Sequence, residues 1–170
     1  MDSSALKSDG TLDSKEMAIL SEITAWMAIN SEGIHGTRPW KISGEGPSLE
    51  GTIRDTSVFK LLPPIPDTSP GATRSAGARD SGNKPFTAQD VRFTSKGTTL
   101  YAFLMGWPEQ EALIGSLGTA SKPEAGKIQN VELLGFKGKL TWKQEAAGLR
   151  VRMPPEKPCD HAAALKMTLG

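Results

Sequence analysis

The chain has 170 residues, which is long enough for one domain with a hydrophobic core and too short for two domains of ordinary size. Its 20 lysines and arginines balance 19 aspartates and glutamates, so the net charge of +1 creates no field that would attract nucleic acid or an anionic membrane. The single cysteine, Cys159, excludes an internal disulfide, and no His/Cys cluster has the spacing of a zinc site, so we expect neither a metal nor a cofactor. No run approaches the roughly 20 apolar residues of a membrane span.

Residues 13–31 are predicted to form an amphipathic α-helix. Asp13 and Glu16 have the spacing of a capping box at the helix start, and Asn30 and Gly33 are typical of a helix end. Apolar side chains recur at intervals of three and four residues, which places them on one side of a helix: Ile19, Leu20, Ile23, Trp26 and Met27.

After residue 51 the apolar pattern changes to a period of two, which is typical of strands. Residues 91–94 and 99–107 are predicted to form a β-hairpin around a turn at 95–97. The other expected strands cover residues 52–60, 112–117, 128–136, 139–144, 149–153 and 162–169. Short, evenly spaced strands with glycine-rich turns indicate an antiparallel β-sandwich over residues 52–170. The predicted fold class is therefore mainly β, with one amphipathic N-terminal α-helix before the sandwich.

Three segments show neither pattern. Residues 1–12 are expected to be a junction or tail, and residues 32–51 to be a connector between the helix and the sandwich. Residues 33–47 contain four glycines and two prolines, which favour turns and rigidity over a regular element. Residues 61–86 are rich in Pro, Gly, Ser and Thr and are expected to form a long mobile loop.

Acidic side chains near the connector are the candidate catalytic groups. Glycoside hydrolysis needs two carboxyl groups about 5 to 10 Å apart, one of them held protonated. Glu45, Glu50 and Asp55 are the candidates, with Asp90 further along, but closeness in sequence does not create that geometry. We therefore expect no catalytic residue among them. The sequence also lacks a Gly-x-Ser-x-Gly motif and a phosphate-binding glycine loop.

Two tryptophans and one histidine are the candidate substrate-binding residues. Flat aromatic rings match the apolar faces of sugars. Trp40 and Trp107 each stand next to Pro or Gly and are the candidate exposed pair, whereas Tyr101 and Trp142 are in phase with core residues. His35 lies in the connector, where the alternative is a hydrogen-bonded structural role.

Three stretches together form a specific pattern within residues 6–108. They are "LKSDGTLDSKEMAILSEITAWMAINSEGIHGTRPW", "GEGP" and "FTAQDVRFTSKGTTLYAFLMGWP". This pattern resembles the segment with which family 29 α-L-fucosidases leave their catalytic barrel through its last helix and enter a C-terminal β-sandwich. The resemblance implies retaining hydrolysis of terminal α-L-fucose from glycans by an Asp nucleophile and a separate acid/base carboxylate. Those residues belong to the barrel, so none is carried over to this chain.

Three functional hypotheses follow. The first is an accessory sandwich of an α-L-fucosidase, whose partners are a fucosylated glycan or the missing catalytic barrel. The second is a stand-alone carbohydrate-binding module. The third is a small active α-L-fucosidase that uses its own Glu or Asp residues. The resemblance implies that related proteins are often secreted, periplasmic or lysosomal, but the first residues lack a signal-peptide pattern and the localisation stays open.

The helix creates a stability problem, because its apolar stripe would normally pack on a barrel. Each large side chain left exposed forfeits about 1.5 to 3 kcal/mol of burial. We therefore expect the helix either to fold back on the sandwich or to mediate self-association through Ile19, Leu20, Ile23, Trp26 and Met27.

Overall fold

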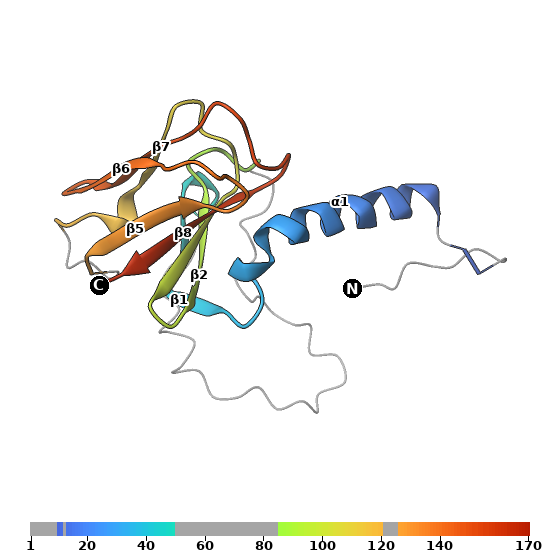
Figure 1. Ribbon diagram of the computed structural model, residues 1–170, viewed down its shortest axis with the longest axis horizontal. Coiled ribbons are helices and arrows are strands. Elements are labelled where there is room, and N and C mark those ends of the chain that lie inside the picture. Colours follow the sequence, from blue (N-terminus) through green and yellow to red (C-terminus); the bar gives the residue numbers. More distant parts are fainter. Residues whose placement is uncertain (1–9, 12, 50–84, 121–125) are drawn as a thin grey trace.

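The computed structural model describes residues 10–11, 13–49, 85–120 and 126–170, whose strands form two antiparallel sheets (Figure 1). The five-stranded sheet has the order β1-β2-β3-β8-β5 and contains β1 (Arg38–Glu45), β2 (Val91–Lys96), β3 (Thr99–Leu104), β8 (Ala163–Leu169) and β5 (Ile128–Leu133). The three-stranded sheet has the order β4-β7-β6 and contains β4 (Glu111–Ile114), β7 (Gly148–Arg152) and β6 (Thr141–Glu145). The predicted fold class, an antiparallel sandwich after one N-terminal helix, is confirmed.

The core lies between the two sheets because alternate side chains of each strand point inward. On β5, Val131 and Leu133 are buried and pair in register with Met167 and Leu165 of β8, both of which are fully buried. The three-stranded sheet contributes Val151 of β7, also fully buried, from the opposite side.

β2 and β3 form the expected hairpin. Their register runs from Val91 opposite Leu104 to Lys96 opposite Thr99, so the loop consists of residues 97 and 98. The second strand ends at Leu104 and not at residue 107 as predicted. There the backbone turns away, and the Met105 N–H donates to the carbonyl of Asp90 at 2.8 Å.

The expected connector contains a strand that the sequence pattern did not reveal. β1 covers residues 38–45 and pairs with β2 at one edge of the five-stranded sheet. The β1–β2 register shifts between Pro39 and Gly44, which disturbs the period-two pattern. Residues 112–117 also differ from the prediction of one strand, because β4 ends at Ile114 and a 3₁₀ turn, η4 (Gly115–Leu117), follows it.

The helix α1 (Ser14–Asn30) begins where Asp13 caps it, with the carboxylate accepting a hydrogen bond from the Lys15 N–H at 2.8 Å. Figure 1 shows that α1 points away from the sandwich and meets it only at its C-terminal end. Ile19 and Ile23 are 56% and 51% exposed, so the helix does not fold back over the sandwich along its length. Self-association through these residues stays a prediction.

Within the described ranges, no helix is long and apolar enough to cross a membrane. The same part of the chain holds no group of three or more His, Cys, Asp or Glu side chains placed to bind a metal ion.

Candidate functional site

Glu45 ties the end of β1 to η4. One carboxylate oxygen accepts the Gly115 N–H at 2.7 Å, and the other accepts the Ser116 N–H at 2.7 Å and the Ser116 hydroxyl. The carboxylate therefore joins the edge of the five-stranded sheet to the turn that follows β4 in the other sheet. Glu45 has a complete structural role in this geometry. Glu50 and Asp55, the other two candidate acids of the connector region, lie outside the described residues.

Asp90 is fully buried and organises the turn before β2. Its oxygens accept the Ser48 N–H at 2.8 Å, the Thr87 N–H at 2.8 Å and the Thr87 hydroxyl at 2.9 Å. Burial pushes the pKa of Asp90 upward, but the hydrogen bonds from Ser48 and Thr87 outweigh burial and lower the pKa to about 2. A carboxyl with this pKa is ionised at neutral pH and has no proton to donate as a general acid.

A cleft of about 940 Å³ lies beside the end of β1 and the start of β4. Its polar lining consists of Glu45, Gln89, Glu109, Gln110, Glu111 and Ser116. Glu45 is bound as described above, and Glu111 forms an ion pair with Arg150 at 2.5 Å. No aromatic ring lines this cleft among the described residues. Two of its three carboxylates are thus held by structural contacts.

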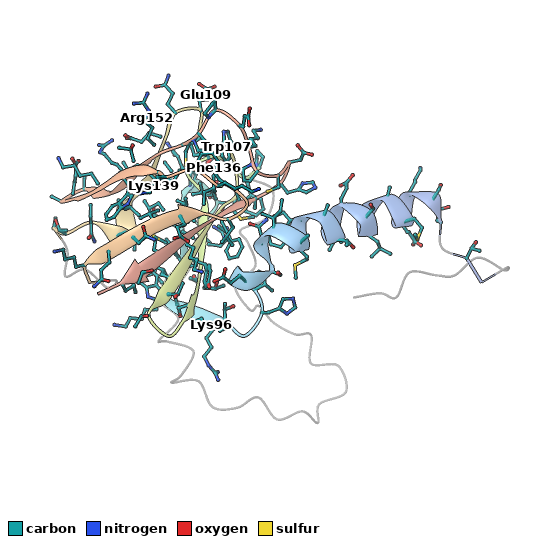
Figure 2. All side chains as sticks on the ribbon, viewed as in Figure 1. Lys96, Trp107, Glu109, Phe136, Lys139 and Arg152 are labelled. Carbon is teal, nitrogen blue, oxygen red and sulfur yellow. The ribbon has the colours of Figure 1, made fainter. Side chains whose placement is uncertain are left out.

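The structure corrects the expectation that Trp40 is an exposed ring. Trp40 is 6% exposed and packs edge-on against Phe93, with ring centroids 5.1 Å apart. The tryptophan points into the core because residue 40 belongs to β1 and not to a loop. Trp107, labelled in Figure 2, is half-buried and packs against the same core. His35 is exposed in the turn between η1 (Ser31–Gly33) and β1. Ligand binding by Trp107 and His35 stays a prediction.

The C-terminal end of α1 is fixed on the outer face of the five-stranded sheet. The indole N–H of Trp26 donates to the carbonyl of Ala162 at 2.6 Å, and its ring lies 6.0 Å from that of Phe103. Phe103 forms a small second apolar cluster with Tyr101 and Ala164, on the side of the sheet away from the main core. The angle at which α1 leaves the sandwich is therefore set by side-chain packing and a direct hydrogen bond.

Glu32 strengthens this joint immediately after the helix. Its carboxylate accepts a hydrogen bond from the Tyr101 hydroxyl at 2.8 Å and pairs with Lys166 at 2.5 Å. Hydrogen bonds from Lys166 and Tyr101 lower the pKa of Glu32. Burial, followed by the hydrogen bond to Glu32, raises the pKa of Tyr101 to about 12. The segment after α1 is thus tied to both β3 and β8.

Gly33 allows the backbone to approach the sheet closely. A Cβ atom at this position would lie 2.7 Å from Cζ of Phe103, so no other residue fits without displacing that ring. The Gly33 carbonyl also accepts a hydrogen bond from the Thr94 hydroxyl at 2.7 Å. The sequence pattern marks Gly33 as a helix end and a connector glycine but does not reveal this close approach, because the packing depends on Phe103, 70 residues away in the chain.

The rest of α1 carries uncovered apolar surface on two sides. One groove, of about 340 Å³, is lined by Ile19, Ile23 and Trp26 together with the polar pair Glu22 and His161. A second groove, of about 500 Å³, is lined by Met17, Leu20, Ser21, Thr24, Ala25 and Ala28. A helix with apolar side chains on more than one side is typical of a helix packed between neighbours.

The chain matches the model of a known family, the alpha-L-fucosidase C-terminal domain, over residues 83–168. Tissue alpha-L-fucosidase of Homo sapiens is 23% identical over 88% of this chain, and an alpha-L-fucosidase of Branchiostoma floridae is 22% identical over 87%. These alignments cover 23% and 24% of the two relatives, so the chain spans about a quarter of their length.

Solved structures show the same fold. Alpha-L-fucosidase isoenzyme 1 from Paenibacillus thiaminolyticus covers 98% of this chain with a TM-score of 0.57 and 16% identity. An alpha-fucosidase of Thermotoga maritima covers 96% with a TM-score of 0.59 and 15% identity. In both cases the match uses 29% of the other chain. With its two-sheet sandwich and the family match over half its length, this chain belongs to the α-L-fucosidase C-terminal domain family.

Proposed function

We propose that the chain is the C-terminal accessory sandwich of an α-L-fucosidase and that α1 is the element by which the sandwich is attached to the catalytic barrel. The observation that carries this proposal is the contrast within α1. Its last turn is fixed on the sheet by Trp26, whereas Ile19 and Ile23 are more than half exposed.

A helix fixed in this way sets the orientation of a neighbouring body relative to the sandwich. Because Trp26 and Glu32 both bind the outer face of the five-stranded sheet, any body that packs on the exposed part of α1 is held in one orientation to the sandwich. Ile19 and Ile23 are each about half exposed, so burying the remainder of both is worth about 1.5 to 3 kcal/mol before ordering costs are subtracted. The grooves on two sides of α1 support packing inside a larger structure over contact with a small ligand.

The chemistry of the acids supports an accessory role. Glu45 accepts two backbone N–H groups and Asp90 is held ionised in the core, so neither is available as the proton donor of a glycosidase. We propose that hydrolysis of terminal α-L-fucose belongs to the longer protein and uses carboxylates of its barrel.

The first experiment assays the purified chain for release of nitrophenol from an aryl α-L-fucoside. The expected result is no release above that of heat-denatured protein. Release that survives further purification, and that Glu45→Gln abolishes without changing the circular dichroism spectrum, would overturn the proposal. Glu109→Gln is assayed beside it, because Glu109 is the carboxylate of the same cleft that has no ion pair in the described part of the chain, and loss of genuine release in that variant would overturn the proposal equally.

The second experiment sequences the coding region that precedes the codon for Met1. The proposal expects an open frame whose product alternates strands and helices and hydrolyses the aryl fucoside when it is expressed with this chain. An in-frame stop codon directly before Met1, in a gene expressed as it stands, would contradict it.

A stand-alone carbohydrate-binding module is the second candidate. Trp40 is buried, so one of the two exposed rings on which the binding-module hypothesis depended is not available. One observation does favour saccharide binding: a second cleft lies at the other edge of the sandwich, between β5 and β6.

A further inference from the structure

A cleft of about 700 Å³ opens between β5 and β6, the edge strands of the two sheets. It is lined by residues 130–140 and Trp142. Its volume falls within the roughly 300 to 1,000 Å³ of small-molecule sites. At one end the gap between the sheets is bridged by Gln144, which accepts the Ile128 N–H at 3.1 Å and donates to the carbonyls of Leu117 and Gly126. Beyond this bridge the two sheet edges stay apart.

Two aromatic rings line the cleft and are held in place from behind. Phe136 and Trp142 are half-buried and pack against the main core. The loop that carries Phe136 is fixed by hydrogen bonds from the Leu134 N–H to Ala164 and from the Phe136 N–H to Leu133, at 2.9 and 3.1 Å. A Cβ atom on Gly138 would collide with the Phe136 ring, so this ring lies directly against the loop backbone. The rings therefore form a preorganised apolar surface.

The rim of the cleft carries two cations whose charge is not neutralised. Lys137 and Lys139 are exposed, and neither has an ion pair in the described part of the chain. By contrast, Lys143 pairs with Glu145 at 2.8 Å, and Lys166 pairs with Glu32. Figure 2 shows Lys139 beside β5 and β6, on the same side of the sandwich as Phe136.

The lining also contains one acidic side chain, Glu132. Glu132 accepts a hydrogen bond from the Asn130 amide at 2.8 Å and stands opposite Lys166 in the β5–β8 register. Since Val131 and Leu133 point into the core, the Glu132 side chain lies on the other face of the sheet. Lys137 and Lys139 outnumber this carboxylate, so the lining of the cleft carries a net positive charge.

We propose that this cleft binds an acidic saccharide, that is, a sugar carrying a carboxylate or a sulfate. The rings of Phe136 and Trp142 offer flat surfaces to the apolar face of a sugar ring. Among the described residues β5 has no strand partner on this side, so beyond Ile128, whose N–H is bound by Gln144, its backbone N–H and C=O groups are available to sugar hydroxyls, which both donate and accept. Lys137 and Lys139 supply charge-assisted bonds to the acidic group. The mixture of rings, backbone polar groups and cations favours a saccharide over a purely apolar ligand.

The test is isothermal titration of the whole chain with 3′-sialyllactose and with lactose at low salt. The expected result is an affinity about tenfold higher for the sialylated sugar, the effect of two partly exposed ion pairs. This preference should shrink when the salt concentration is raised to 0.5 M. Neither probe contains fucose, so the outcome does not depend on whether the longer protein hydrolyses fucosides.

Variants assign the binding to the cleft. The double variant Lys137→Gln, Lys139→Gln should lose the preference for the sialylated sugar, whereas Phe136→Leu should weaken both sugars. Lys96→Gln is the matched control, because Lys96 ends β2, which lies three strands away from β5 in the same sheet, and Figure 2 shows it apart from Lys139. Equal affinity for the two sugars, an unchanged preference in the double variant, or tighter binding of a hexaglutamate peptide than of 3′-sialyllactose would each overturn the proposal.

Discussion

The sandwich and the helix α1 use the same kinds of apolar side chain in opposite ways. Leu165 and Met167 in β8 are completely buried, whereas Leu20 and Ile23 in α1 are 43% and 51% exposed. The sandwich therefore obtains its stability from contacts made within this chain. Most of α1 does not, because its apolar side chains stay on the surface of the chain.

The last turn of α1 is the boundary between the buried apolar side chains of the sandwich and the exposed ones of the helix. Asn30 is fully buried there and donates to the carbonyl of Trp26 at 3.1 Å and to the sulfur of Cys159 at 3.7 Å. Toward the N-terminus, the exposed apolar residues have no such partners on the sheet. Mutations on the two sides of this boundary should consequently differ in what they change.

The largest effect is expected in the core. Leu165→Ala removes a fully buried side chain from β8, an interior strand of the five-stranded sheet, and should lower the free energy of unfolding by about 2 to 5 kcal/mol. The matched variant Ile19→Ala should change it by less than about 0.5 kcal/mol, because Ile19 is 56% exposed. Urea denaturation measures both. Equal losses of unfolding free energy in the two variants would contradict the contrast between the sandwich and α1.

Acid should weaken the sandwich through Asp90. The folded-state pKa of about 2 lies below the ordinary value of 3.8, so folding favours the ionised carboxylate. This contribution, on the order of 2 kcal/mol, is complete above about pH 4 and is lost as the pH falls through about 2. Unfolding midpoints measured between pH 6 and pH 2 test it. Asp90→Asn should be less stable at neutral pH and should lose this part of the acid dependence; an unaltered acid profile in that variant would refute the assignment.

Removing the indole hydrogen bond should weaken the joint between the two regions. Trp26→Phe removes the indole donor of the Ala162 carbonyl, which keeps only the weak contact from the Cys159 thiol at 3.5 Å, and should reduce stability by about 1 to 2 kcal/mol. Limited proteolysis should then cleave α1 faster in this variant than in the parent chain, and before it cleaves β8. Ile23→Phe, a control on the same side of the helix but away from the sheet, should leave the cleavage rate unchanged.

The smallest effect on stability is expected for polar changes on the exposed helix. The double variant Ile19→Ser, Ile23→Ser should leave the unfolding midpoint of the sandwich within error but lower any concentration-dependent association. Sedimentation velocity from micromolar to millimolar concentration makes the comparison. A monomeric parent chain at the highest concentration would remove self-association as a role of this surface.

Elements defined by local patterns were predictable. The Asp13 cap, the β2–β3 hairpin and the alternation of β7 follow from neighbouring residues, and the structure has all three. β1 was not predicted, because Pro39, Gly44 and the register shift between them disturb the period-two pattern of apolar residues. Trp40 was misjudged for the same reason, since its flanking residues indicate a loop while the strand turns its ring inward.

The sites built from distant residues were not predictable. Glu32 contacts Tyr101 across 69 positions, and Glu45 contacts Ser116 across 71. No local pattern pairs such residues, because the contact depends on which strands become neighbours. The β5–β6 cleft is a further case: Trp142 was assigned to the core, and only the separation of two sheet edges shows that its ring also borders open space.

Hydrogen exchange along α1 tests the central claim most directly. In the isolated chain at low micromolar concentration, amides of residues 17–23 should exchange within seconds, whereas those of residues 27–30 should be protected nearly as well as β8. This gradient would show that the sandwich holds only the last turn of the helix. Uniform, strong protection along all of α1 in the monomeric chain would contradict the account, because the helix would then need no further body to pack against.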